Sequence, residues 1–453
     1  MEALDNEKDL DALALELAQR IYNGEDITAD DDLLRLTAQQ LLKGVHQGLD
    51  TNLNAIDFSS PDFDTLAKLT ENVYHFSAAK NYHELRDLSI ALRDGDKIRS
   101  FEDFKRKAEE ISLKYNVSWL RSEYNQAIAA SQSAAHWNSF YKDKDLMPYL
   151  QYQAVMDSNT REEHAALNGV IRRIDDKFWD TYMPPNGWGC RCEAIQLPGS
   201  FYSETPDKDI DFPTVPTMFR INFGKQSLAF PPSHPYFKRL PEDQQHLLKE
   251  KSRQEIRRIL SNAEQYKKLK QDNNYTDVKF NWTTGGLKAT HKGHISHDSD
   301  KEERFFKELT KDGKGLSSTQ LEKFCQDNLF RMGHRVYLRD ESQKDMDGKI
   351  LPALDIELDG KAMDIRSITS ANNYGRSLCV KNSQLGRIKK KTGYAGDSVC
   401  LYFHNPAMFF SNDKLINDAE WYKNYIVECG STQRIKHIYV VINGEKKLIR
   451  HDI

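Results

Sequence analysis

The sequence contains few cysteines, no long apolar run and little net charge. Six cysteines in 453 residues are too few for a disulfide framework, so a reducing, cytoplasmic origin is expected. A membrane-spanning helix needs roughly 18 or more consecutive apolar residues, and no such run occurs. The first residues also lack a basic flank followed by an apolar core, so we expect neither a membrane partner nor a secretory signal peptide.

The charge that is present is unevenly distributed. The net charge is −4, of which residues 276–453 contribute about +5 and residues 1–275 about −9. Charged residues make up 29% and hydrophobic residues 39% of the chain, which is typical of a polar but folded protein of two or three domains. Only the C-terminal part therefore offers electrostatic attraction to nucleic acid.

Apolar periodicity and turn residues divide the chain into four segments. Residues 1–70 are predicted to be a helical segment, and residues 70–197 a mainly helical domain with a strand over 149–156. Residues 198–274 contain a proline-rich loop and then a charged helix over 241–274, which we expect to be a solvated spacer. Residues 275–453 are predicted to form an α+β domain.

The α+β prediction for residues 275–453 rests on alternating apolar segments bounded by turn residues. Strands are predicted over 334–340, 352–360, 361–368, 397–404 and 436–444. Helices are predicted over Ser318–Arg331, around Val380–Lys391 and around Leu415–Tyr425. The expected fold class is therefore multidomain, with a mainly α N-terminal region, a charged helical linker and a C-terminal α+β domain.

A short stretch before residue 193 collects residue types that bind metals. Thiolates and imidazole suit Zn²⁺, and four candidate ligands occur here: Asp157, His164, Cys190 and Cys192. The proline- and glycine-rich loop between them is too turn-rich for a helix or strand interior. A structural zinc site is one interpretation. The alternative is a cysteine-containing loop packed under Trp179 and Trp188, with His164 as an ordinary helix histidine.

The same stretch resembles the phage head morphogenesis domain of the Mu F type, over roughly residues 70–197. The resemblance rests on the order and spacing of Asp157, Thr160, Arg161, His164, Leu167, Asn168, Gly169, Asp175 or Asp176, Phe178, Trp179, Pro184, Pro185, Gly189, Cys190, Arg191 and Cys192. It implies a minor capsid component inside the head near the portal, with phage portal and capsid proteins as partners.

Two acidic residues flank a tight turn in the C-terminal region. If the chain forms a hairpin around Asp359-Gly360, Asp355 and Asp364 lie directly opposite each other, with Arg366 on the same face as Asp364. Like charges opposite each other are costly in a sheet unless a cation lies between them. The hairpin therefore predicts that either a divalent metal or a basic substrate-binding group lies between the two aspartates.

This pattern resembles the signature of restriction endonucleases, Asp followed by Asp/Glu-x-Lys, in which the acids hold Mg²⁺ or Zn²⁺. Arg366 stands here where the family has Lys, and arginine cannot easily act as a base. The resemblance therefore moves the water-activating role to Lys381, and it implies Glu322 as an additional acid on the preceding helix. The catalytic residues predicted are Glu322, Asp355, Asp364, Arg366 and Lys381.

Residues 280–453 also resemble C-terminal toxin domains of contact-dependent inhibition systems and prophage polymorphic toxins. The residues that carry this resemblance are Gly333–Val336, Asp355–Gly360 with Asp364–Ser367, and Lys381–Gln384. Many such domains are tRNA or DNA nucleases, so a restriction-endonuclease-like fold is expected. A metal-independent RNase fold of the barnase or colicin type is the alternative, with His404 as a candidate acid.

Other charged groups in this region have ordinary interpretations as well. One basic run can either bind nucleic-acid phosphates or form a solvated helix end, and it consists of Arg387, Lys389, Lys390 and Lys391. The three histidines His291, His294 and His297 are expected to be flexible linker residues rather than a metal cluster. An exposed acid pair at a hairpin tip, without any ligand, is the ordinary interpretation of Asp355 and Asp364.

Taken together, the two halves predict a minor head protein that carries a C-terminal nuclease toxin. Such a protein would be made in the host cytoplasm, reside in the virion interior and enter the target cell with the phage DNA. Its nucleic-acid substrate is RNA or DNA, and an immunity protein is an expected partner. The alternative is a purely structural head protein whose C-terminal extension binds DNA or the portal.

Overall fold

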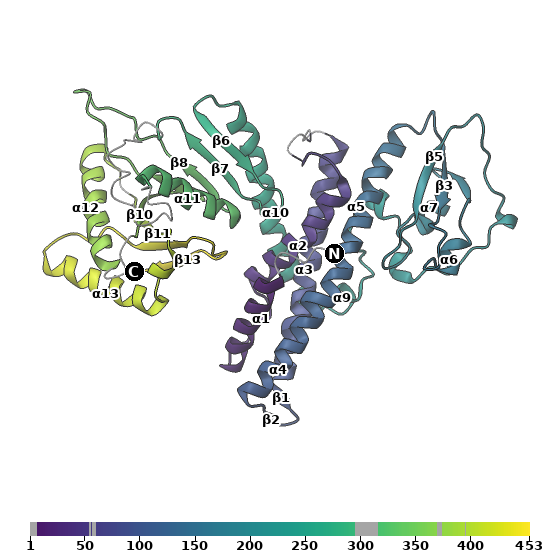
Figure 1. Cartoon of the computed structure of the whole chain (residues 1–453), viewed down its shortest axis with the longest axis horizontal. Coiled ribbons are helices and arrows are strands. Elements are labelled where there is room, and N and C mark those ends of the chain that lie inside the picture. The colour runs from purple at the N-terminus through teal and green to yellow at the C-terminus, as the bar shows by residue number, and fades with distance from the viewer. Residues whose placement is uncertain (1–6, 54–55, 57–59, 295–315, 369–373, 395) are drawn as a thin grey trace. The chain divides into compact units, whose positions relative to one another are not determined.

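The computed structural model describes residues 7–53, 56, 60–294, 316–368, 374–394 and 396–453, and it divides into two compact units (Figure 1). Unit 1 is Met1–Arg257 and unit 2 is Arg258–Ile453, so the boundary falls within helix α10 (Glu242–Gln271). Within the described ranges, no helix is long and apolar enough to span a membrane.

Unit 1 is built mainly from long helices. They are α1 (Glu7–Tyr22), α2 (Asp31–Leu49), α3 (Pro61–Ala91), α4 (Phe101–Ser112) and α5 (Leu120–Lys142), with a π-helical segment over Leu113–Trp119 and a small hairpin of β1 (Arg93–Asp94) and β2 (Lys97–Ile98). Asp30 caps α2 because its carboxylate accepts from two backbone amides of the first turn. The helical character predicted for residues 1–70 and for the first part of residues 70–197 is confirmed.

Two features fix the packing of these helices. A Cβ atom at Gly48 would lie 2.3 Å from the carbonyl oxygen of Ile128, so α2 and α5 approach more closely than any other residue at that position allows. Between α3 and α5, the fully buried Lys80 forms an ion pair with Glu123 and donates to the carbonyl oxygen of Tyr115 at 2.7 Å. Buried charges persist only when paired in this way.

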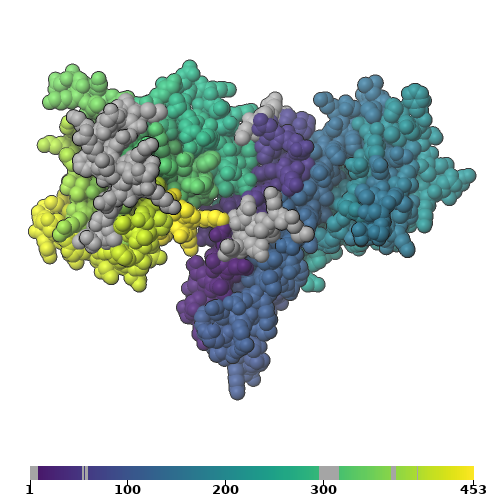
Figure 2. Space-filling model, viewed as in Figure 1, coloured from purple at the N-terminus to yellow at the C-terminus, as the bar shows by residue number. Residues whose placement is uncertain are grey.

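A small sheet follows the helices of unit 1. Strands β3 (Tyr149–Gln153), β4 (Ile171–Arg173) and β5 (Glu193–Leu197) form an antiparallel sheet in the order β4-β3-β5, with the short helices α6 (Glu162–Ala165) and α7 (Phe178–Tyr182) beside it. In Figure 2 these residues form one packed lobe, coloured blue to teal. The predicted strand is confirmed, although it ends at Gln153 rather than at residue 156. Two further short helices, α8 (Phe223–Gln226) and α9 (Pro235–Lys238), follow, and the unit ends within α10.

Unit 2 contains an eight-stranded mixed sheet in the order β13-β12-β11-β10-β9-β8-β7-β6. The strands are β6 (Tyr275–Phe280), β7 (Leu287–His291), β8 (Arg335–Leu338), β9 (Ile356–Leu358), β10 (Lys361–Ser367), β11 (Ser398–Phe403), β12 (His437–Ile442) and β13 (Ile449–Asp452). Strand β10 is antiparallel to β9 but parallel to β11. The predicted strands β8 to β12 are confirmed, whereas β6, β7 and β13 were not predicted.

Helices cover both faces of this sheet. Helix α11 (Ser318–Arg331) buries Leu321, Cys325 and Leu329 against one face, together with Cys400 and Tyr402 of β11. On the other face, α12 (Tyr374–Thr392) and α13 (Asn412–Glu428) pack on Val399, Leu401 and Phe403. The alternation along β11 is that of a strand covered on both sides. Unit 2 is therefore a three-layered α/β/α arrangement, and all three predicted helices are confirmed.

Helix α10 differs from its prediction as a solvated spacer. Its C-terminal half buries Ile259 and Ala263 completely, and Asn262 Nδ2 donates to the carbonyl oxygen of Gly285 at 2.8 Å. The segment is a helix, as predicted, but its apolar face is part of unit 2. The compact unit consequently begins at Arg258, ahead of the predicted domain start at residue 275. Few apolar residues form this face, so the apolar periodicity of the helix is weak and the sequence did not reveal that it is buried.

Candidate functional site

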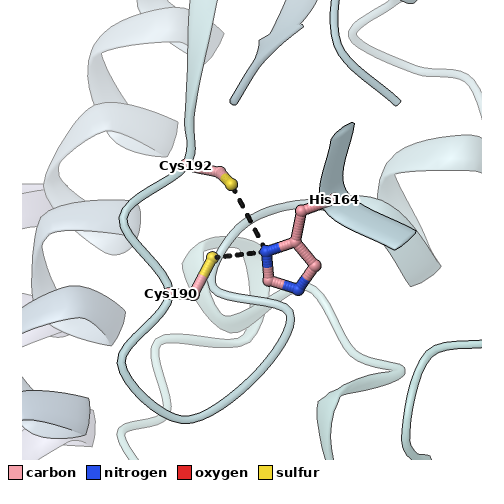
Figure 3. Close-up of side chains that lie close together, drawn as sticks. All are labelled: His164, Cys190 and Cys192. Carbon is pink, nitrogen blue, oxygen red and sulfur yellow. Dashed lines mark hydrogen bonds between the residues drawn. The ribbon is translucent and has the colours of Figure 1, made fainter. Parts of the chain in front are cut away.

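In unit 1, three of the predicted zinc ligands lie together and form what we call the Cys–His cluster, namely His164, Cys190 and Cys192. His164 Nδ1 lies 3.6 Å from Cys190 Sγ and 3.4 Å from Cys192 Sγ (Figure 3). His164 projects from α6, and the two cysteines precede β5. Cys190 lies close enough to donate to Cys192, which lowers the pKa of the Cys192 thiol to about 4 and raises that of Cys190.

The loop that presents the cysteines is held by buried polar contacts. Asn186 is 2% exposed, and its Nδ2 donates to the carbonyl oxygens of Thr181 and Met183, each at 3.3 Å. Tyr152 of β3 donates from its hydroxyl to Asn186 Oδ1 at 3.1 Å. These contacts fix the loop against the sheet, so the positions of the two thiols depend on the fold rather than on the loop alone.

Asp157, the fourth predicted zinc ligand, does not join the Cys–His cluster. Its two carboxylate oxygens accept from Arg191 Nη1 at 2.6 Å and Nη2 at 2.7 Å. The hydrogen bonds from Arg191 lower the pKa of Asp157 well below its ordinary value. A bidentate pair with arginine uses the same oxygens that a metal would need. The sequence alone could not reveal this ion pair, because Arg191 lies 34 residues after Asp157 and only the fold brings the two side chains together.

The geometry of the Cys–His cluster fits zinc. A tetrahedral zinc ion holds sulfur at about 2.3 Å and nitrogen at about 2.0–2.1 Å, which places two such ligands about 3.6 Å apart. The two sulfur–nitrogen distances of 3.6 and 3.4 Å match this separation. Among the described residues, the group of potential ligands contains only these three side chains. A fourth position would therefore be left for water or another ligand.

In unit 2, the hairpin around Asp359-Gly360 has the predicted register. Leu358 pairs with Lys361 and Ile356 with Met363. The first strand begins at Ile356 rather than earlier, so Asp355 lies just beyond the ladder. At Asp364, strand β10 changes its partner from β9 to β11, and Asp355 Oδ2 accepts from the backbone N–H of Ile365 at 2.6 Å. The two aspartates therefore lie where β9 and β10 separate.

Lys381 of α12 lies directly against these two acids. Its Nζ is 3.0 Å from Asp364 Oδ2 and 3.9 Å from Asp355 Oδ2. Burial and the neighbouring Asp355 raise the pKa of Asp364 well above its ordinary value, although Lys381 opposes this. Burial would lower the pKa of Lys381, but the two aspartates raise it. The sequence prediction that Lys381 joins the aspartates agrees with this arrangement.

Glu322 belongs to a second group of potential ligands, with His294 and Glu341, and among the described residues this group includes neither Asp355 nor Asp364. Glu322 Oε2 lies 3.1 Å from Nε2 of His294, and Nδ1 of His294 lies 3.4 Å from Oε1 of Glu341. Burial and then Asp355 raise the pKa of Glu322 to about 7. Burial would lower the pKa of His294, but Glu322 and Glu341 raise it to about 10. The expectation that His294 is a flexible linker residue is wrong, because its side chain is fully buried.

We call these six residues the acidic cluster: Glu322, Glu341, Asp355, Asp364, Lys381 and His294. None of their side chains is more than 16% exposed. With all six ionised, four carboxylates oppose two cations, which leaves a formal charge of minus two in a buried site. Uncompensated buried charge is costly, and the raised pKa values of Asp364 and Glu322 mean that protons can balance it; a divalent cation would take the place of those protons. The donor set is thus chemically suited to the metal that the hairpin predicted.

The remaining predicted site residues lie outside this cluster. Arg366 is exposed on β10, two residues after Asp364. The predicted nucleic-acid-binding residues are exposed on the C-terminal half of α12 and are Arg387, Lys389, Lys390 and Lys391. His404 is half-buried, lies 3.1 Å from the hydroxyl of Tyr402 and packs against Phe324. His297 lies outside the described residues, and His291 Nδ1 lies 3.7 Å from Asp340.

Sequence reasoning missed His294 and Glu341 as members of the acidic cluster. His294 lies shortly after β7, and Glu341 follows β8, so neither belongs to the motif of the hairpin. Strands β7 and β8 are parallel neighbours, which brings the segments after both strands to the same edge of the sheet. Because β7 was not predicted, neither its pairing with β8 nor the resulting proximity of His294 and Glu341 could be predicted.

Comparison with known proteins bears on unit 1. Residues 86–195 match the family model described as "Phage Mu protein F like protein". The chain is 41% identical over 95 residues to the "Putative capsid assembly protein F" of Escherichia phage Mu, which covers 21% of each chain. It is 51% identical over 64 residues to the "Mu-like prophage FluMu F protein" of Haemophilus influenzae, covering 14% of this chain and 16% of that protein. No solved structure matches.

The matched region contains the helix α5, most of the small sheet and the whole Cys–His cluster. The chain spans about a fifth or less of the length of the curated relatives that it matches. The predicted resemblance, given as roughly residues 70–197, is confirmed over most of its length. Residues 86–195 are therefore similar to the phage Mu F-like family.

Proposed function

We propose that this chain is a minor head protein of a Mu-like phage or prophage and that unit 2 is a metal-dependent nuclease. The Mu F-like domain supports the first half, since a relative that matches it is named as a capsid assembly protein. Phage portal and capsid proteins are then its partners, and the head interior is its location. The acidic cluster is the observation that carries the second half.

Each member of the cluster has a distinct role in this proposal. Asp355 and Asp364 would hold the divalent ion, with Glu322 as a further ligand. A divalent ion held there would supply Lewis acidity toward a phosphate oxygen and would lower the pKa of a water molecule. Lys381 Nζ, which lies at the aspartates, would donate to the attacking water or to the phosphate oxygen that gains charge. Hydrolysis forms a new P–O bond and breaks the P–O ester bond, whose leaving oxygen takes up a proton.

The exposed basic groups would hold the substrate rather than the ion. By strand alternation Arg366 projects on the same face as Asp364 but remains exposed, which suits a contact with a flanking phosphate. The basic run on α12 begins six residues after Lys381, about 9 Å farther along the helix. RNA or DNA could therefore extend along α12 from the acidic cluster.

A nuclease inside a phage head would need to be restrained in the cell that makes it. An immunity protein that covers the acidic cluster is the partner that this proposal requires. Delivery into the target cell with the phage DNA would then release the activity. A purely structural role for the chain is the competing proposal, and it is favoured by the relative's name as a capsid assembly protein.

The test is incubation of the purified full chain with total RNA and with plasmid DNA, with and without EDTA. We expect cleavage that EDTA abolishes and that Asp364→Asn reduces by at least about 100-fold. Glu420→Gln, which changes an exposed carboxylate of α13, is the matched control and should cleave normally. Absence of cleavage with Mg²⁺, Mn²⁺ and Zn²⁺ would favour the structural role. Cleavage that resists EDTA would favour the metal-independent RNase that uses His404.

We also propose that the Cys–His cluster holds a structural zinc ion. Metal analysis of the full chain should find one equivalent of zinc fewer in Cys192→Ser than in the parent, together with a lower melting temperature of unit 1. Cys429→Ser, which changes an exposed thiol of unit 2, is the control and should retain the zinc. A full zinc content in Cys192→Ser would instead favour the packing interpretation of this loop.

A further inference from the structure

His294 occupies a position in the acidic cluster that the nuclease proposal does not use. Its side chain is 0% exposed, and both ring nitrogens face carboxylates at 3.1 and 3.4 Å. The distances are those of ion pairs, but neither nitrogen has a well-directed hydrogen bond from the described residues. A buried imidazole aimed at two acids in this way needs an explanation beyond packing.

The backbone around His294 holds the ring in place. The N–H of Gly293 donates to His291 Nδ1 at 3.1 Å, and a Cβ atom at Gly293 would lie only 2.0 Å from Asp340 Oδ1. The turn that carries His294 is thus packed tightly against the segment after β8, which includes Glu341. Glu322 is also fixed, since Ser318 Oγ donates to its Oε1 at 3.1 Å and leaves Oε2 for His294.

We propose that His294 Nε2 and Glu322 are ligands of the divalent ion of unit 2, that Glu341 orients His294 through Nδ1–H, and that the site therefore selects Zn²⁺ over Mg²⁺. This inference rests on the nuclease proposal only in placing an ion at the acidic cluster. It adds a nitrogen ligand to a set that otherwise contains only oxygen.

The arrangement of the three side chains supports this proposal. A metal-bound histidine almost always donates its second ring N–H to a carboxylate or carbonyl group, and Glu341 provides such a carboxylate. Two ligands about 2.1 Å from a tetrahedral zinc ion lie about 3.4 Å apart, so His294 Nε2 and Glu322 Oε2, which lie 3.1 Å apart, would separate by about 0.3 Å to bind it. His294, Glu322 and Glu341 also offer ligand atoms within 4.8 Å of one another.

The choice of metal follows from ligand chemistry. Imidazole is a good ligand for Zn²⁺, whereas Mg²⁺ prefers oxygen ligands and retains several water molecules. Removal of a nitrogen ligand should therefore weaken Zn²⁺ binding far more than Mg²⁺ binding. Glu341 should act on the same metal indirectly, because a carboxylate that accepts from a liganding imidazole increases its basicity.

The experiment is calorimetric titration of the full chain with Zn²⁺ and with Mg²⁺. Cys190→Ser and Cys192→Ser are included in every sample so that the Cys–His cluster does not contribute. We expect Zn²⁺ to bind more tightly than Mg²⁺, and His294→Gln to weaken Zn²⁺ binding by about 100-fold while Mg²⁺ binding changes little. Glu341→Gln should weaken Zn²⁺ binding by about 10-fold. His437→Gln, which changes a part-buried histidine of β12, is the control and should bind Zn²⁺ normally.

Zn²⁺ binding that is unchanged in His294→Gln would overturn the inference and leave His294 as an imidazolium between two acids. Should His294→Gln fail to fold, as judged by circular dichroism, the comparison of Glu341→Gln with the parent decides in the same way. Co²⁺ bound in place of Zn²⁺ provides a second readout, since the visible absorption spectrum of the Co²⁺-loaded parent should differ from that of His294→Gln and of Glu341→Gln. Loss of Zn²⁺ binding in these variants without any nuclease activity would sustain this inference and refute the nuclease. Mg²⁺-dependent cleavage that is unchanged in His294→Gln would support the nuclease and refute this inference.

Discussion

The ammonium group of Lys381 is surrounded by more negative charge than it can balance. It lies 3.0 Å from Asp364 and 3.9 Å from Asp355, and Glu322 also acts on it. Replacement of Lys381 by methionine keeps the length of the side chain but removes its charge. Without this cation the cluster becomes more negative, so its affinity for a divalent ion should stay the same or increase.

We predict that Lys381→Met lowers cleavage by about 100-fold or more while metal affinity does not fall. The melting temperature of unit 2 should fall without metal, because buried carboxylates lose their partner, and recover when metal is added. Nuclease assays, calorimetry and thermal unfolding measure the three effects. Lys414→Met, which removes an i,i+4 partner of Asp418 on α13, is the control. A loss of metal binding in Lys381→Met would contradict the charge argument.

Glu84 of α3 is a buried acid whose protonation should be visible in the stability of unit 1. Burial raises its pKa from 4.5 to about 7, although Lys80 and a hydrogen bond from Asn116 oppose the shift. The folded state therefore retains a proton that the unfolded chain releases. Between about pH 4.5 and pH 7 the free energy of unfolding should fall as the pH rises, by at most about 3 kcal/mol.

Glu84→Gln should remove most of this fall, so the variant should gain stability relative to the parent at pH 8 but not at pH 5. Chemical denaturation at both pH values measures the difference. Glu71→Gln, an exposed position on the same helix, should follow the parent. An unchanged pH dependence in Glu84→Gln would show that another buried acid, such as Glu123, dominates.

At the scale of helices and strands, the close contact between α2 and α5 depends on glycine. A Cβ atom at Gly48 would meet the carbonyl oxygen of Ile128 at 2.3 Å, and one at Gly44 would meet that of Tyr124 at 2.9 Å. Backbone atoms cannot yield as a flexible side chain can. We predict that Gly48→Ala destabilises unit 1 by about 1–3 kcal/mol, despite the better helix propensity of alanine.

Gly386→Ala provides the contrasting case in α12, since its Cβ atom would meet only the guanidinium group of Arg434, at 3.0 Å or more. That side chain can move, so the higher helix propensity of alanine should leave unit 2 as stable as the parent or more stable. Denaturant titrations of both variants decide the matter. Equal effects of the two substitutions would mean that α2 and α5 can separate at little cost.

The elements that sequence predicted best are those with local causes. Asp359 and Gly360 both have positive φ, so the tight turn fixed the hairpin register and hence the position opposite Asp364. Ser317 and Gln320 form a capping box that starts α11 at the predicted residue. Strands β6 and β7 were missed because their register shifts at a bulge and β7 is buried at four successive positions, without alternation.

The site residues that sequence missed have causes that are not local. Asp157 was assigned to zinc because its competing partner, Arg191, meets it only in the fold. His294 was assigned to a linker because its two carboxylate partners come from α11 and from the segment after β8. In both cases the residue type was informative, but the partner that decides its chemistry is distant in the chain. Only strand order and helix packing supply that partner.

At the scale of the whole molecule, the compact unit that holds the acidic cluster includes part of α10. Arg258 Nη2 donates to the carbonyl oxygen of Thr284 at 3.0 Å, and Asn262 donates to that of Gly285. The fully buried side chain of Ile259 lies where a Cβ atom at Gly285 would meet it at 2.5 Å. A fragment that begins at residue 275 would lose all of these contacts.

We therefore predict that the fragment 242–453, which retains the whole of α10, is more stable than 275–453 by about 3 kcal/mol or more, since removal of one buried isoleucine side chain alone costs about 2–5 kcal/mol. Within the full chain, Ile259→Ala should destabilise unit 2, whereas Leu247→Ala, at a 43% exposed position of the same helix, should not. Urea denaturation measures both comparisons. Equal stability of the two fragments would place α10 outside the folding unit, and nuclease assays could then use residues 275–453 alone. If the prediction holds, an inactive 275–453 fragment says nothing against the nuclease, because the acidic cluster needs a sheet that α10 stabilises.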